Sequence, residues 1–213
     1  MKKTTVIRSL IALIIAGSLW SCKPRGAEYI DELDLVYTNY DANFDYKSRA
    51  TFSLPDSIIK ITGDGISDSS KVQFIDNTYA GPILASIRSN MISRGWKEVK
   101  KSENPDVLLL PSVSTTTNIY YTYNYGYYWG WYYPYYPYGG WYYPYYPSTV
   151  SGYRTGSLFV QMTSPKTPTP TGQLPVVWSA IFNGMLEGGT SYVTSRVQSS
   201  INQAFTQSPY LQH

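Results

Sequence analysis

The stretch Asn104-Pro105-Asp106-Val107-Leu108-Leu109-Leu110-Pro111 decides the fold of this 213-residue chain. Val107–Leu110 is an apolar run of strand length. Pro111 predicts the end of that strand, because proline has no backbone N–H to donate. The segments before and after this strand supply the rest of the fold.

Apolar residues at helical spacing predict one helix before this strand and one at the end of the chain. Pro82 suits the first turn of the earlier helix, and Gly95 suits its end. Thr190 or Ser191 suits the N-cap of the later helix. The predicted buried stripes are Ile83, Leu84, Ile87 and Met91 in the first helix and Val193, Val197, Ile201, Ala204 and Phe205 in the second.

Four further segments alternate between apolar and polar residues, which is the period-two pattern of half-buried strands. They are built on Leu33, Leu35 and Tyr37, on Ala50, Phe52 and Leu54, on Leu158, Val160 and Met162, and on residues 177–182. The order of elements is strand, strand, helix, strand, long insertion, strand, strand, helix. This order favours an α+β two-layer sandwich, in which two helices cover a mixed or antiparallel sheet of about five strands.

The first 21 residues have the parts of a secretory signal peptide. Lys2, Lys3 and Arg8 form a positive region, and residues 10–16 form an apolar core. That core is shorter than the about 20 residues that a membrane-spanning helix needs. Leu19-Trp20-Ser21-Cys22 is similar to the lipobox of bacterial lipoproteins, although Trp20 is bulky for its position.

The lipobox resemblance implies cleavage before Cys22, a diacylglycerol on its sulfur and acylation of its new amino group. The alternatives are an ordinary signal peptide with an incidental cysteine, or a short membrane anchor. We therefore predict a signal peptide at residues 1–21, a tether at 22–29 and a single α+β domain at 30–213 with an aromatic insertion at 118–152.

The charge balance argues against a nucleic-acid partner. Loss of the signal peptide removes Lys2, Lys3 and Arg8, which leaves 14 basic residues against 14 acidic ones. A nucleic-acid surface needs an excess of basic residues to neutralise phosphates. Cys22 is the only cysteine, so an internal disulfide is excluded and stability must come from the core.

A series of short motifs is similar to one family in order and spacing. The chain resembles the envelope lipoproteins built on the domain of unknown function 4136, which implies an α+β domain on a membrane tether and no attributed activity. This chain has Gln161 where the family often has an acid, and the family lacks the tyrosine tract described next. The motifs are Asn39-Tyr40-Asp41 with Phe44, Thr51-Phe52, Gly95-Trp96, Asn104 to Leu109, Gly156 to Val160, Val177-Trp178-Ser179-Ala180, and the final helix with Phe205.

The segment 120–147 is extremely rich in aromatic residues. It holds 15 tyrosines and three tryptophans, and it contains the heptapeptide Trp-Tyr-Tyr-Pro-Tyr-Tyr-Pro twice, at 131–137 and 141–147. Two copies are too few for a solenoid, and the prolines interrupt any central strand. Polyproline II, turns and an irregular hairpin arm all remain compatible with this composition.

Four roles are open for this insertion. The first is a loosely folded low-complexity loop with no binding role, and the second is a surface for protein or self-association. The third is a platform that stacks on sugars, and the fourth is a segment that contacts the membrane headgroups. The candidate contact residues for a partner or a glycan are Trp129, Trp131, Tyr132, Tyr133, Trp141, Tyr142 and Tyr143.

The sequence contains no recognisable catalytic or metal-binding constellation. The only histidine is His213, so a catalytic triad would depend on the last residue, and zinc sites of His and Cys are excluded. Asp64 and Asp68 lie in a glycine-containing turn but lack the distal glutamate of an EF-hand. Paired acids such as Asp41 and Asp45 leave a hydrolase with a carboxylate site as the third hypothesis.

We therefore expect a non-enzymatic, membrane-anchored envelope lipoprotein that acts as a structural or interaction module. Its only non-protein group would be the lipid on Cys22. The alternative is a lipoprotein that binds glycan or peptidoglycan through stacked rings. We expect the outer membrane of a Gram-negative cell, with the periplasmic face favoured because Lys23-Pro24-Arg25-Gly26 lacks the acidic residues of known surface-export signals.

Overall fold

The computed structural model describes residues 36–61, 72–114, 132, 141–142, 156–170, 172–183 and 190–213. All of them belong to one compact unit, Asp34–His213. The predicted signal peptide, Cys22 and the tether lie outside the described residues, and so does the turn with Asp64 and Asp68. No helix within the described ranges is both long and apolar enough to cross a membrane.

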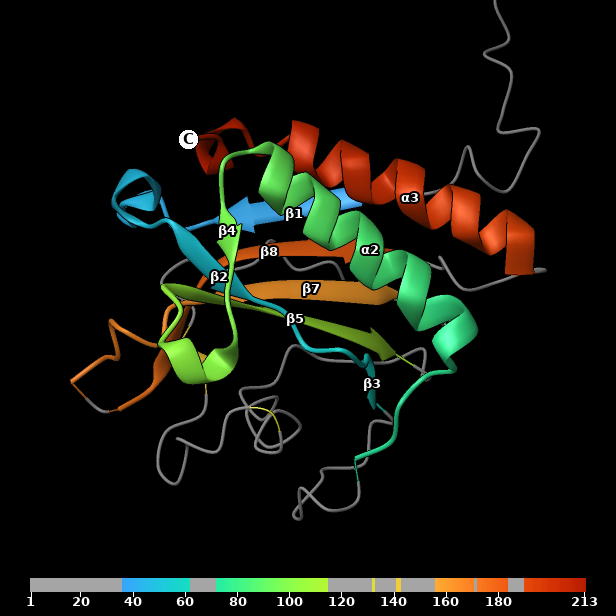
Figure 1. Ribbon diagram of the computed structural model, residues 1–213, viewed down its shortest axis with the longest axis horizontal. Helices are drawn as coiled ribbons and strands as arrows, with labels where there is room; N and C mark the ends of the chain where they lie inside the picture. The colour runs from blue at the N-terminus through green and yellow to red at the C-terminus, as the bar shows by residue number, and fades with distance from the viewer. Residues whose placement is uncertain are drawn as a thin grey trace, which may run out of the picture. The chain divides into compact units, whose positions relative to one another are not determined.

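The described residues form a mixed sheet (Figure 1). Its main order is β1-β8-β7-β5-β2-β4, and the first three pairs are antiparallel whereas β2 is parallel to both neighbours. The short β3 and β6 pair in parallel with β5 and β8. The bounds are β1 Val36–Tyr40, β2 Thr51–Ser53, β3 Ile59–Ile61, β4 Lys97–Glu98, β5 Val107–Ser114, β6 Trp141–Tyr142, β7 Leu158–Thr163 and β8 Leu174–Phe182.

Two helices, α2 (Asn77–Ser93) and α3 (Thr190–Thr206), cover one face of this sheet (Figure 1). The predicted α+β sandwich with a mixed sheet is confirmed. The structure has more strands than the about five expected, because β3, β4 and β6 are only two or three residues long and carry no recognisable periodicity.

The start of α2 differs from the prediction. Asp76 caps the helix, with its carboxylate accepting the Thr78 N–H at 2.8 Å, so Pro82 lies inside the helix and not in its first turn. The predicted end is confirmed, since Gly95 follows the helix with a φ of +92°. A Cβ at Gly95 would also lie 2.9 Å from the Cβ of His213, so glycine is required here for two reasons.

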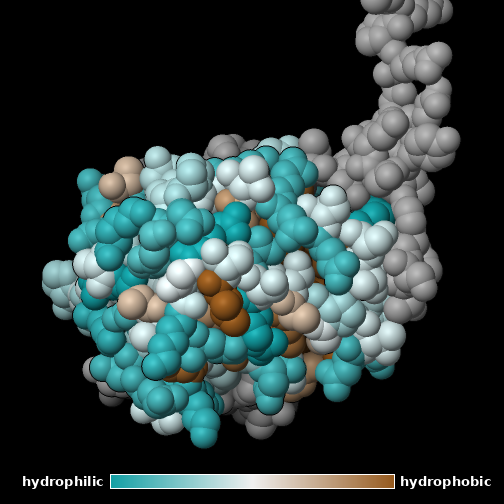
Figure 2. Space-filling model, turned by 45° about the horizontal axis from the view of Figure 1, so that its top comes forward, coloured by the Kyte–Doolittle hydropathy of each residue, from teal (hydrophilic) through white to brown (hydrophobic). Residues whose placement is uncertain are grey.

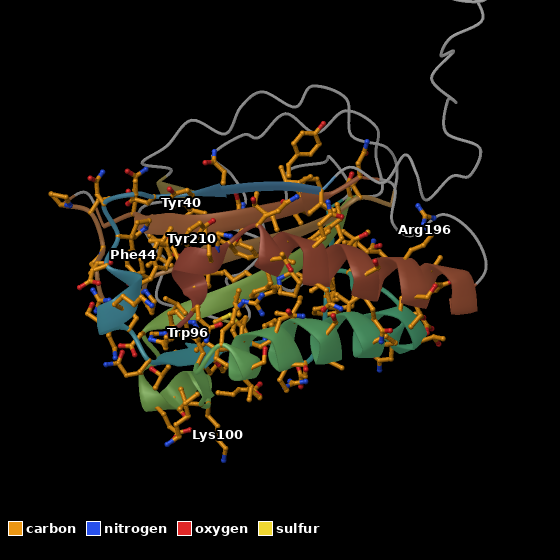
Figure 3. All side chains as sticks on the ribbon, turned by 90° about the horizontal axis from the view of Figure 1, so that it is seen from above. Tyr40, Phe44, Trp96, Lys100, Arg196 and Tyr210 are labelled. Atoms are coloured by element: carbon orange, nitrogen blue, oxygen red, sulfur yellow. The ribbon has the colours of Figure 1, made fainter. Side chains whose placement is uncertain are left out.

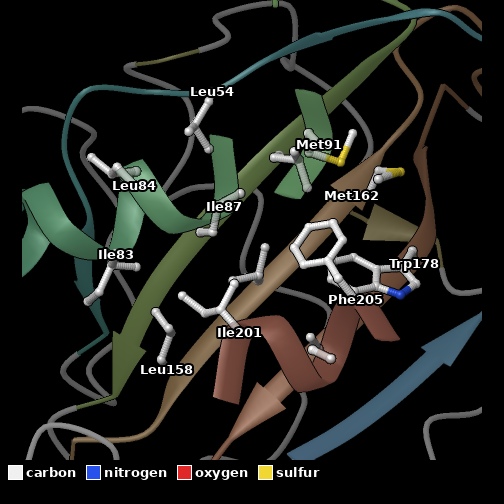
Figure 4. Close-up of a cluster of buried hydrophobic side chains, with 14 of the residues drawn as sticks. Leu54, Ile83, Leu84, Ile87, Met91, Leu158, Met162, Trp178, Ile201 and Phe205 are labelled. Atoms are coloured by element: carbon white, nitrogen blue, oxygen red, sulfur yellow. The ribbon is translucent and has the colours of Figure 1, made fainter. Parts of the chain in front are cut away.

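The predicted helical stripes form the core between the two layers (Figure 4). They pack on the helix-facing side chains of β7 and β8, including Leu158, Met162 and Trp178. Trp96 and Trp178 are both buried. The aromatic ring of Phe205 lies 5.4 Å from that of Trp178 and joins the end of α3 to the sheet.

Two strand predictions need correction. Pro111 does not end β5, which continues to Ser114. On one side Pro111 lies opposite Val160 of β7, and on the other it lies level with the break between β2 and β3. No neighbouring strand therefore needs the N–H that proline lacks. In β1, Val36 packs against the core and Tyr37 lies on the other face. Side chains on both faces of β1 are half-buried, so alternation predicts the strand but not which face meets the helices.

Asp106 ties the start of β5 to two other segments. Its carboxylate accepts the backbone N–H groups of Ala50 and Thr51, at 3.0 and 2.9 Å, and the Thr51 hydroxyl at 2.7 Å. It also pairs with the Lys166 ammonium at 2.8 Å. Burial alone would raise the pKa of Asp106, but the hydrogen bonds from Lys166, Ala50 and Thr51 outweigh it and hold that pKa well below its ordinary range.

This network predicts a pH-dependent contribution to stability. Because the pKa of Asp106 is lower in the folded than in the unfolded chain, its stabilisation is complete above the unfolded-state pKa of about 4 and is lost as the pH falls below it. We expect Asp106→Asn to lower the free energy of unfolding at pH 7 by about 1–3 kcal/mol and to flatten its fall below about pH 5. Urea unfolding at a series of pH values measures both effects, and equal pH profiles for the two proteins would contradict this assignment.

Candidate functional site

Tyr132 is one of two described points at which the aromatic insertion meets the domain. Its side chain is only 6% exposed, and its hydroxyl shares a 2.8 Å hydrogen bond with the Ser53 hydroxyl on β2. The Lys101 ammonium donates to the Tyr132 carbonyl at 3.0 Å and lies 5.0 Å from the centre of its ring. Burial raises the pKa of Tyr132, so its hydroxyl stays protonated at neutral pH.

Ser53 places this contact on the sheet face opposite the helices. Phe52 and Leu54 belong to the core between the layers, so the residue between them points to the other side. That opposite face is also buried, and it mixes apolar Leu108 and Phe159 with polar Gln161. Gln161 stands level with Leu110 and Ser179 in the sheet register.

The second attachment of the insertion is β6. Trp141 and Tyr142 pair in parallel with Leu174 and Pro175 at the start of β8. The backbone of this part of the insertion is thus an added strand of the domain sheet. Trp129, Trp131, Tyr133 and Tyr143 lie outside the described residues, so their predicted contact role stays a prediction.

Tyr132→Phe should cost stability, because it leaves the Ser53 hydroxyl without its aromatic partner. We expect the free energy of unfolding to fall by about 1–2 kcal/mol, and Tyr132→Ala to lower it by about 3–5 kcal/mol through the added loss of packing. Chemical denaturation monitored by circular dichroism measures both. Tyr40→Phe removes a hydroxyl from an exposed tyrosine and is the matched control, expected within about 0.5 kcal/mol of the parent. Equal stability of Tyr132→Ala and the parent would show that the insertion is not held at this point.

A second group of aromatic residues lies where β1, the short 3-10 helix η2 (Tyr46–Ser48) and the C-terminal 3-10 helix η6 (Pro209–Leu211) meet (Figure 1). We call Tyr40, Phe44, Tyr46 and Tyr210 the aromatic corner; Figure 3 labels three of its members and shows them gathered there. Tyr40 stacks on Tyr210 with ring centres 4.0 Å apart and planes at 22°. The ring centre of Tyr46 lies 5.3 Å from that of Tyr210 and 4.8 Å from that of Phe44.

Interior hydrogen bonds hold the aromatic corner in place. The Tyr46 hydroxyl donates to the Val177 carbonyl, and the Tyr210 hydroxyl donates to Ser208 Oγ at 3.1 Å. Ser208 Oγ also accepts the indole N–H of Trp178 at 2.9 Å. Burial raises the pKa of Tyr210, which keeps this hydroxyl a donor.

Two basic side chains, Arg49 and Lys47, lie beside this corner. The Arg49 guanidinium lies 5.5 Å from the centre of the Phe44 ring, and its buried Nε–H has no hydrogen-bond partner among the described residues. Lys47 donates through its ammonium to the Gln212 carbonyl. Partial burial, and then the charge of Lys47, lower the pKa of His213, which favours its neutral form.

The last residue is fixed in the structure. The backbone N–H of His213 donates to the Arg94 carbonyl at 2.9 Å, and its ring packs edge-on against Trp96 at 4.6 Å. The Trp96 indole N–H donates to the Leu211 carbonyl at 2.8 Å. His213 therefore closes the end of α2, and these contacts give it a structural part.

Metal ligands do not gather in the described ranges, which hold no group of three or more His, Cys, Asp or Glu side chains able to bind one ion. The surface over the helices is largely hydrophilic (Figure 2). Large hydrophobic side chains of the described residues that are exposed are Tyr40, Phe74 and Ile92. The pairing of Tyr40 with Tyr210 could not be predicted, because partners 170 positions apart leave no periodic signal. In the sequence, Tyr40 stands out only as part of the Asn39-Tyr40-Asp41 motif.

Comparison with known proteins agrees with the motif order. A family model described as Domain of unknown function (DUF4136) matches residues 36–210. This chain belongs to the DUF4136 family. It is 34% identical to a DUF4136 family protein from Bacteroides thetaiotaomicron whose crystal structure is known, with a TM-score of 0.62 over 84% of this chain and 97% of that one.

Two other solved structures share less with this DUF4136 protein. Both are of the PelC dodecamer from Paraburkholderia phytofirmans. The first is 12% identical with a TM-score of 0.36, covering 79% of this chain and 95% of that one. The second, a point variant of the same dodecamer, is 14% identical with a TM-score of 0.33, covering 84% and 98%. No curated protein matches the chain.

Proposed function

We propose that this DUF4136 protein is a non-enzymatic envelope lipoprotein, anchored in the outer membrane by Cys22, whose aromatic insertion contacts a protein partner. One observation supports this proposal most. The insertion is attached to the domain at two described points, through the buried Tyr132 and through the strand pairing of Trp141 and Tyr142 with β8.

These attachments matter because binding has an entropic cost. A contact residue on a rigid scaffold loses less conformational freedom on binding than one on a free chain. Tyrosine and tryptophan supply large contact areas with few rotatable bonds, and they dominate the energy of many protein interfaces. An insertion attached at Tyr132 and at β6 would therefore lose less conformational freedom on binding than a free chain.

The anchor gives the proposed contact its setting. Several acyl chains on Cys22 would hold the chain firmly, since each buried methylene contributes about 0.8 kcal/mol. The mature chain, with equal numbers of acidic and basic residues, has no net charge to draw it to nucleic acid. We place the domain on the periplasmic side, where envelope proteins are the available partners.

Crosslinking in intact cells tests the proposed contact. Three forms are compared: the parent, a form with residues 120–147 replaced by a Gly/Ser linker of equal length, and Trp129→Ser/Trp131→Ser/Trp141→Ser. The triple variant keeps Tyr132 and so keeps the described side-chain attachment. We expect both changed forms to lose the main crosslinked partner of the parent.

The control for this experiment is Phe74→Ser/Ile92→Ser, which removes two exposed apolar side chains of the domain. It should retain the partner. Each form is first shown to unfold cooperatively, so that loss of the fold is not read as loss of the contact. An unchanged partner list in both insertion variants would refute the proposed role of the insertion.

A further inference from the structure

We propose that the exposed face of Tyr40 is a saccharide-binding platform, completed by the polar side chains of Thr38 and Gln207. The ligand class is a linear β-linked oligosaccharide whose pyranose rings present a flat C–H face. This site lies on the domain itself and goes beyond the proposed role of the insertion.

The geometry of the Tyr40 ring suits stacking on a sugar. Tyr40 is 41% exposed, more than any other residue of the aromatic corner. One face of the ring is covered by the parallel Tyr210 ring at 4.0 Å. Among the described residues no other ring contacts Tyr40, so its opposite face is the surface on which a pyranose ring would stack. An aromatic face gives apolar contact area while its hydroxyl keeps a polar handle for a sugar hydroxyl.

Hydrogen bonds and strand pairing already order the platform. Tyr210 is held by its hydrogen bond to Ser208, and Ser208 accepts from the fully buried Trp178. Tyr40 itself ends β1, and its backbone lies opposite Trp178 in the sheet register. A ring held this way loses little freedom when a ligand binds, and weak ligands such as sugars depend on that saving in entropy.

Two polar side chains, Thr38 and Gln207, complete the platform. Thr38 is two residues before Tyr40 on β1, so both side chains lie on the same face of the strand. The Thr38 hydroxyl donates to the Gln207 side-chain oxygen at 3.4 Å, which directs the Gln207 amide. Gln207 is exposed, and within the described ranges its Nε2 donors have no partner. Sugar sites combine one apolar face with a few such placed polar groups.

Calorimetric titration of the full chain tests the platform, in a detergent whose headgroup is not a sugar. The probes are chitotetraose, cellotetraose and maltotetraose. Chitotetraose carries the acetamido groups of cell-wall glycans and cellotetraose does not, so they separate the two sources of β-linked glycan. We expect binding of at least one β-linked probe with a dissociation constant of about 1 mM or tighter, and weaker binding of the bent α-linked maltotetraose.

Variants locate the site on β1. Tyr40→Ala should weaken binding at least about tenfold, whereas Tyr40→Phe, which keeps the ring, should stay within about threefold of the parent. Tyr37→Ala is the matched control, because Tyr37 lies on the other face of the same strand, and it should bind as the parent does. The unfolding transition of each variant is measured alongside.

Two results overturn the platform: a parent that binds none of the probes, and a Tyr40→Ala variant that folds and binds like the parent. Neither result bears on the insertion. Conversely, the insertion variants should lose the crosslinked partner and still bind the saccharide with the affinity of the parent.

Discussion

Trp178→Ala should lower the free energy of unfolding by about 3–5 kcal/mol, which is a large part of the stability of a typical domain. Trp178 has no exposed area, and its ring packs 5.4 Å from that of Phe205 on α3. Its indole N–H donates to Ser208 Oγ, which in turn donates to the Ala204 carbonyl. The substitution thus creates a cavity between the layers and also leaves a buried hydroxyl without one of its partners. Guanidinium unfolding, followed by circular dichroism, measures the loss.

Trp178→Phe separates the two parts of this effect. It keeps most of the ring volume but removes the indole N–H, so we expect a smaller loss of about 1–3 kcal/mol. A loss below about 1 kcal/mol for Trp178→Ala would show that the helices are not held to the sheet through this residue.

Cys22→Ser should move the protein almost completely from the membrane fraction to the soluble fraction. This expectation follows from the proposed lipid anchor, because serine offers no sulfur for the diacylglycerol and the acyl chains supply the binding energy. Ultracentrifugation of broken cells followed by immunoblotting measures the distribution. Intact-protein mass spectrometry of the parent should show a chain that begins at residue 22 and carries the lipid mass.

Ser21→Ala is the matched control for the anchor, since it changes the neighbouring residue and keeps the sulfur. It should remain in the membrane fraction. The anchor would be refuted if the Cys22→Ser variant stayed in the membrane fraction without any lipid mass. Another part of the chain would then hold it there.

Much of the fold could be predicted because its signals are local. The stripes of α2 and α3 repeat at helical spacing within helices of 17 residues each, and a long periodic segment gives a strong signal. The alternation in β7 and β8 was sufficient for the same reason. Gly95 predicted the end of α2, because a positive φ favours glycine.

The errors arose where a distant neighbour decides the outcome. Pro111 is tolerated inside β5 only because β2 and β3 pair on either side of its position, and no local pattern shows that break. The strands β4 and β6 have two residues each, too few for a period. Strand order depends on pairings across the whole chain, such as Val36 with Phe182.

For the candidate site, the amino-acid composition predicted which segment is involved but not which residues make contact. The tyrosine tract marked the insertion, but not that Tyr132 would be the buried residue or that Ser53 would be its partner. The aromatic corner brings residues 40–46 to residue 210, so its members have no shared motif. The position of the last residues could not be predicted either, although hydrogen bonds of Leu211 and His213 with Trp96 and Arg94 fix them against the end of α2.

Site-specific photocrosslinking tests the central claim most directly, namely that the aromatic insertion contacts a protein partner. A photoreactive phenylalanine replaces Trp131 or Trp141 in turn, and Ile92, which is 51% exposed on α2, is the control position. After irradiation of intact cells, the account predicts one discrete adduct with the same envelope protein from positions 131 and 141 and none from position 92. Adducts of equal yield from all three positions, or from position 92 alone, would contradict it.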